Sequence, residues 1–77
     1  MYIATFFTHF GAVSFNRNLE KMGRTGIMMP VPRVLSASCG VCIKFDSIDG
    51  IDFAVCTDLS EIYLEENKKY KLIYSME

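Results

Sequence analysis

The chain has 77 residues, of which 51% are hydrophobic and 22% are charged, and its net charge is −1. This length suits one small domain over residues 1–77, and the apolar content favours a compact core over a disordered chain. The near-zero net charge gives no overall basic character, so we expect no nucleic-acid partner.

The charges are unevenly distributed along the chain. Residues 1–45 carry five bases and one acid, a balance of +4, whereas residues 46–77 carry three bases and eight acids, a balance of −5. We interpret the acidic half as a solvated helix. The alternative is an acidic docking patch for a partner protein.

The amino terminus lacks the features of a secretory signal. No basic residue precedes the apolar run from Tyr2 to Phe7, and His9 soon interrupts it. No stretch approaches the ~20 apolar residues that a membrane-spanning helix needs. We therefore expect a cytoplasmic protein that does not enter a membrane and whose three cysteines stay reduced.

The first elements have clear patterns. β-branched and aromatic residues predict a strand from Tyr2 to Phe7. Thr8 is a suitable helix cap, and apolar residues recur at helical spacing between His9 and Met22. Gly23 and Gly26 then predict the end of this helix.

The remaining elements complete a recognisable order. We predict strands over residues 27–31, 40–45 and 69–76, and a helix over residues 51–66 whose first turns are the least clear. The resulting β-α-β-β-α-β order is that of an α+β, ferredoxin-like domain. Such a domain has a four-stranded antiparallel sheet with two helices on one face.

This topology predicts which segments meet. The end of strand one, the start of the first helix and the loop between strands two and three should lie at one end of the sheet. Strand three should also pair with strand one. We therefore expect Cys39 to lie near Thr8, His9 and the free amides of the first helical turn.

The segment from Pro30 to Cys42 has the strongest chemical signal. Its prolines Pro30 and Pro32 fix two backbone angles, and small residues surround Cys39. A helix N-terminus and Arg33 would lower the pKa of a nearby thiol. His9 would exchange a proton with this thiol; the alternative is that His9 is simply a polar residue in the first helical turn. This pattern is typical of a reactive cysteine; the alternative is a small residue at the top of the core.

Cys42 follows Cys39 at Cys-x-x-Cys spacing and is a candidate resolving thiol. Residues three apart on a strand point to opposite faces, so a redox pair requires Cys39 to lie in the loop. We interpret Cys56 as a core residue. The spacing of the cysteines and the single histidine does not fit a structural zinc site, and no cofactor motif is present.

The chain resembles a family of short bacterial and archaeal domains of unknown function described as selenium/sulfur carrier-like proteins. The resemblance lies in the opening strand followed by Thr8-His9 and a helix, the run Pro30-Val31-Pro32-Arg33, the stretch from Ser36 to Gly40, and a short final strand with a tyrosine. It covers most of the chain. It implies that Cys39 carries sulfur or selenium as a persulfide or perselenide.

The sequence departs from this family at two points. Cys42 replaces an ordinary apolar residue, and the stretch from Asp46 to Cys56 is longer than usual. The first departure favours a resolving thiol. The second leaves the start of the second helix open.

We therefore expect a small carrier that takes sulfur or selenium from a donor protein and passes it to an acceptor. It would be a transfer protein more than a free-standing enzyme. One rival interpretation is a non-catalytic ferredoxin-like module that assembles through its sheet. The other is a thiol redox switch that uses Cys39 and Cys42. A four-stranded sheet with one open face also predicts a homodimer, formed through that face or a sheet edge.

Overall fold

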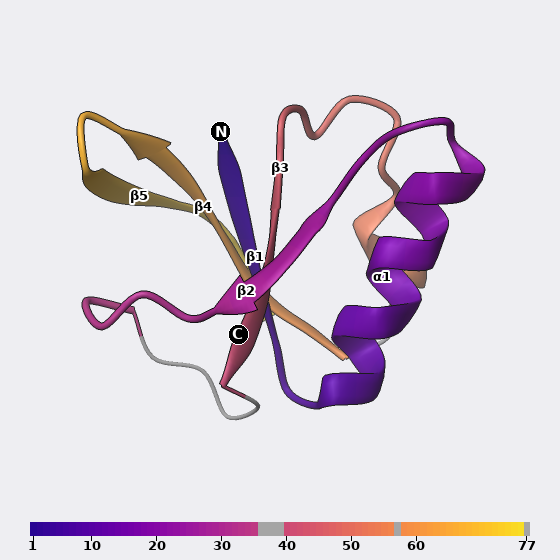
Figure 1. Ribbon diagram of the computed structural model, residues 1–77, viewed down its shortest axis with the longest axis horizontal. Helices are drawn as coiled ribbons and strands as arrows, with labels where there is room; N and C mark the ends of the chain where they lie inside the picture. Colours follow the sequence, from indigo (N-terminus) through magenta and orange to yellow (C-terminus); the bar gives the residue numbers. More distant parts are fainter. Residues whose placement is uncertain (36–39, 57, 77) are drawn as a thin grey trace.

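The computed structural model describes residues 1–35, 40–56 and 58–76. Within these residues the chain forms one α-helix, one short 3-10 helix and five strands (Figure 1). In chain order the elements are β1 (Tyr2–Phe6), α1 (His9–Lys21), β2 (Ile27–Pro30), β3 (Val41–Phe45), η1 (Phe53–Val55), β4 (Leu59–Glu66) and β5 (Lys69–Ser75).

The strands form one antiparallel sheet in the order β2-β3-β1-β4-β5. Strand β3 therefore lies between β1 and β2, and α1 connects β1 to β2 by crossing one face of the sheet (Figure 1). The predicted α+β class, the split β-α-β arrangement and the pairing of β3 with β1 are confirmed.

Helix α1 begins and ends where the sequence predicts. The Thr8 hydroxyl accepts a hydrogen bond from the Gly11 amide, at 3.1 Å, and caps the helix. Gly23 follows the last turn with φ +75°, a left-handed conformation that glycine adopts without strain. The buried face presents Ala12, Phe15 and Leu19, at helical spacing, to the sheet.

The main core lies between α1 and the sheet. The rings of Phe6 and Phe45 lie 5.3 Å from that of Phe15, measured between centroids. The chain returns from α1 to β2 through Gly26, where a Cβ would lie 2.7 Å from Leu19 Cδ1. Glycine is therefore required at this position for the helix to pack this closely.

The predicted second helix is wrong. Residues 51–66 contain only the three-residue η1 and the whole of β4. Leu59 and Ile62 are three apart, a spacing that fits a helix, yet both are buried in the helix-side core. A β-bulge explains this: Phe6 pairs with Leu59 while Thr5 pairs with Glu61, so Ser60 is an extra residue and the two apolar side chains share one face.

The predicted final strand is confirmed, but the sheet has five strands rather than four. A tight turn at Asn67 and Lys68 joins β4 to β5, and both residues have positive φ values of 50° and 64°. Two consecutive left-handed residues are typical of a two-residue β-hairpin. The expected solvated acidic helix is therefore a hairpin strand.

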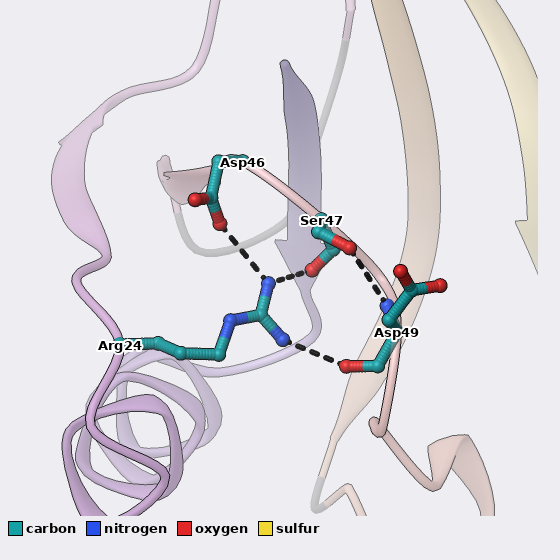
Figure 2. Close-up of polar contacts among 4 residues, drawn as sticks. All are labelled: Arg24, Asp46, Ser47 and Asp49. Carbon is teal, nitrogen blue, oxygen red and sulfur yellow. Dashed lines mark hydrogen bonds and ion pairs between the residues drawn. The ribbon is translucent and has the colours of Figure 1, made fainter.

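The segment between β3 and β4 occupies the place of the missing helix. Phe53 packs against the helix-side core, and its ring lies 4.6 Å from that of Tyr74 on β5. Arg24 holds the start of this segment by donating to Asp46 Oδ1 at 3.1 Å, to Asp49 O at 2.9 Å and to Ser47 O (Figure 2). One side chain after α1 thus fixes a chain segment that lacks regular structure.

Candidate functional site

The segments that the sequence predicts to meet lie at one end of the sheet. The end of β1, the first turn of α1 and the start of β3 are together there (Figure 1). The Val31 amide donates to Gly40 O at 3.1 Å and closes the loop that joins β2 to β3. Cys39 itself lies outside the described residues.

The start of α1 is occupied by a carboxylate that sequence reasoning missed. The Thr8 hydroxyl donates to Asp58 Oδ2 at 2.7 Å, and the Phe7 amide donates to Asp58 O at 2.8 Å. An anion at this position is stabilised by the positive end of the helix dipole. The isolated Asp58 before β4 gave no signal, because its partners are fifty residues away in the sequence.

His9 and Arg33 are both exposed. His9 is the first residue of α1, whereas Arg33 lies in a turn closed by a 3.0 Å hydrogen bond from the Leu35 amide to Pro32 O. In the described part of the chain, neither side chain forms an ion pair. The two predicted site residues therefore lie at the surface.

Cys42 is fully buried on the face of the sheet opposite α1. Its thiol donates to Pro30 O at 3.7 Å, and it packs with Ile3 beneath Leu35 from the β2–β3 loop. Solvent has no access to Cys42 while Leu35 remains docked. The expectation of an open face is therefore wrong at the centre of this face, where Ile3, Thr5 and Cys42 are all buried.

A polar network surrounds this small outer cluster, which we define as Ile3, Leu35 and Cys42. Lys44 Nζ lies 3.0 Å from Glu65 Oε1, and the Tyr70 hydroxyl donates to Glu65 Oε2 at 3.2 Å. The hydrogen bond from Lys44 lowers the pKa of Glu65. Burial and the bond to Glu65 raise the pKa of Tyr70.

A second pair extends the network on β4. The Tyr63 hydroxyl donates to Glu61 Oε1 at 2.7 Å. Burial and this bond raise the pKa of Tyr63 to about 12, so the phenol remains a donor at neutral pH. Sequence reasoning missed Tyr63 and these carboxylates because it placed residues 51–66 on a helix.

Cys56 is half-buried in a hollow of about 290 Å³ between α1 and the β3–β4 segment. Its thiol donates to Asp52 O at 3.4 Å. Burial and the nearby Asp52 charge raise the pKa of Cys56. Cys56 is thus a protonated thiol beside the core and a poor nucleophile.

Comparison with protein families identifies a match over most of the chain. The model of a family described as "Putative Se/S carrier protein-like" matches residues 1–75. No curated protein and no solved structure shows a significant match to the chain. Among the described residues, no helix has the length and apolar character needed to cross a membrane.

Proposed function

The chain belongs to the Se/S carrier protein-like family, and on that premise we propose that it is a small sulfur or selenium carrier that holds a persulfide or perselenide on Cys39. The observation that carries this proposal is the family match, which spans nearly the whole chain and includes Cys39. The carrier works with reduced thiols, so we assign it to the cytoplasm.

The other two cysteines support the choice of Cys39. Cys42 is fully buried, and Cys56 has a raised pKa, so neither is suited to accept sulfur from a partner. The burial of Cys42 also weighs against a redox switch, because a resolving thiol must reach its partner.

The transfer step is an exchange at sulfur. The Cys39 thiolate attacks the outer sulfur of a donor persulfide and forms a new S–S bond. The S–S bond within the donor breaks, and its electron pair leaves on the donor thiolate, so no net oxidation or reduction occurs. A donor perselenide reacts in the same way at selenium, and attack by an acceptor thiolate on the carried atom returns Cys39 to a thiolate.

The neighbouring charges suggest separate roles. Arg33 is exposed six residues before Cys39, and its guanidinium would stabilise the carried anion. Asp58 already places a carboxylate at the start of α1, which offsets the dipole there. We therefore assign the stabilising charge to Arg33 in preference to the helix start, and the proton donor role to His9.

The test is loading by a cysteine desulfurase supplied with cysteine, followed by mass spectrometry of the intact chain. The wild type, Cys42→Ser and Cys56→Ser should each gain the mass of one sulfur atom, and Cys39→Ser should gain none. Equal loading of Cys39→Ser would refute the carrier. Brief alkylation should also label Cys39 faster than Cys56, with an apparent pKa for Cys39 below the ~8.5 of a free thiol.

The edge strand β2 also favours the formation of a homodimer. Its residues Ile27, Met28, Met29 and Pro30 carry no charge, and the Ile27 and Met28 side chains are exposed. An uncharged edge strand is open to pairing with another strand. A homodimer formed by antiparallel pairing of two β2 strands would give about twice the 8.8 kDa chain mass in light scattering, and Met28→Lys should return it to a monomer.

A further inference from the structure

An open hollow lies between the β2–β3 loop and the β4–β5 turn. Val34, Leu35, Lys68, Lys69 and Tyr70 line its volume of about 390 Å³. Both segments lie on the side of the molecule away from α1 (Figure 1). Residues more than thirty positions apart in the sequence thus form one surface.

Side-chain contacts hold both segments that line this hollow. Leu35 is buried in the outer cluster with Ile3 and Cys42, which fixes the loop. The Tyr70 hydroxyl is bonded to Glu65, which fixes the start of β5. Val34 is nevertheless 77% exposed, so an aliphatic side chain faces solvent next to the buried Leu35.

The charged residues that line or adjoin this hollow are all positive. Lys68 and Lys69 are exposed, and so is Arg33, the residue before Val34. None of the three forms an ion pair within the described residues. Glu66 is opposite Lys69 in the hairpin, and both residues line a second hollow together with Lys71, whereas Lys68 and Val34 line only the first.

We propose that this surface docks the protein that exchanges sulfur or selenium with the carrier, through an acidic segment of that partner that bears an apolar side chain. The lysines would pair with the partner's carboxylates, and the apolar side chain would cover Val34. The proposal rests on the carrier function, which requires a donor and an acceptor.

The position of the surface suits that role. Val34 precedes Cys39 by five residues, a length of chain that spans at most about 18 Å. A nucleic acid is a poorer fit, because the chain has a net charge of −1 and would repel a polyanion outside this patch. A short acidic protein segment would contact only the cations of this patch, and so would not be repelled by the rest of the chain.

The test uses NMR titration of the labelled full chain with three synthetic probes. The first is an acidic peptide of glutamates and aspartates with a central leucine, the second has serine in place of that leucine, and the third is a single-stranded oligonucleotide of equal charge. The first peptide should shift the amides of Val34, Leu35 and Lys68 to Tyr70. It should bind more tightly than the other two, and added salt should weaken it.

Matched variants locate the binding. Lys68→Glu with Lys69→Glu should weaken the first peptide at least about tenfold, the equivalent of ~1.4 kcal/mol. In Val34→Ser, the leucine peptide should bind no more tightly than the serine peptide. Arg17→Glu with Lys21→Glu makes the same charge change on α1, at exposed positions, and should have a much smaller effect.

The outcomes separate this proposal from the carrier function. No amide shifts, shifts confined to another surface, or tighter binding of the oligonucleotide would overturn the docking surface. Loading of Cys39 by inorganic polysulfide needs no docking, so Lys68→Glu with Lys69→Glu should load as the wild type does. If polysulfide fails to load the wild type, the carrier function fails, whatever the peptide shows.

Discussion

The two faces of the sheet are built in different ways. The face beneath α1 buries a large apolar core that includes the rings of Phe6, Phe15 and Phe45. The opposite face buries only the small outer cluster, which is flanked by hydrogen-bonded tyrosines, carboxylates and Lys44. Helix α1 and the β3–β4 segment cover the first face, whereas the β2–β3 loop covers the second.

This difference indicates separate tasks. Burial of the larger apolar area supplies most of the folding free energy, so the face beneath α1 holds the fold together. The outer cluster is anchored by Leu35, in the loop that leads to Cys39. A segment with few buried contacts opens at a lower cost than the core, and binding segments are commonly of this kind.

The largest expected effect is on the helix side of the sheet. Phe15→Ala removes a ring that is 3% exposed, and it should lower the free energy of unfolding by about 3–5 kcal/mol in urea denaturation. Phe10 lies on the same helix but is 67% exposed, and Phe10→Ala should change stability by less than ~0.5 kcal/mol. Similar losses for both variants would contradict this picture of the core.

A smaller loss is expected on the outer face. Leu35→Ala should destabilise the docked loop by about 2 kcal/mol and speed alkylation of Cys42 by about 30-fold, since 1.4 kcal/mol is a factor of ten. The measurement is site-resolved mass spectrometry after timed alkylation. Val34→Ala alters the neighbouring exposed residue and should leave the labelling of Cys42 unchanged. Equal acceleration by both would show that Leu35 is not the cover.

Arg24 tests the segment that replaces the second helix. Arg24→Met removes its hydrogen bonds to Asp46, Ser47 and Asp49, and should cost about 1–2 kcal/mol in denaturation. Arg17→Met, at an exposed site on α1, is the control and should be close to neutral. An equally neutral Arg24→Met would mean that core packing alone fixes this segment.

The smallest effect concerns pH and the outer network. Lys44 lowers the pKa of Glu65 in the folded protein, so the ionised pair stabilises the fold above the ordinary carboxylate pKa. That contribution is lost as the pH falls through the lowered pKa. Denaturation midpoints should therefore fall less for Glu65→Gln than for the wild type between neutral pH and about pH 3. Glu66→Gln, at an exposed position, should retain the wild-type dependence.

The first half of the fold was predictable because its signals are local. The Thr8 cap, the apolar spacing of α1 and Gly23 all act within a few residues, and the structure confirms the helix that they predict. The alternation of Val41, Ile43 and Phe45 likewise predicted a strand with one apolar face, and all three side chains contribute to the helix-side core.

The second half was not predictable by the same means. Leu59 and Ile62 fit a helix, and only pairing with β1 reveals the bulge that places both on one face of a strand. The left-handed turn at Asn67 and Lys68 lacks the glycine that would have marked a hairpin. The hydrogen bond from Thr8 to Asp58 and the burial of Cys42 also depend on segments distant in the sequence.

The sequence by itself determined the α+β class, the position of α1, the order of the first three strands and the family resemblance centred on Cys39. Only the tertiary structure decided that residues 59–66 form a strand, that Cys42 lies beneath Leu35, and that Lys68 and Lys69 adjoin Val34. The physical reason is the range of the interactions. Caps and helical spacing act between neighbours, whereas strand register, burial and charge clusters arise when distant segments pack together.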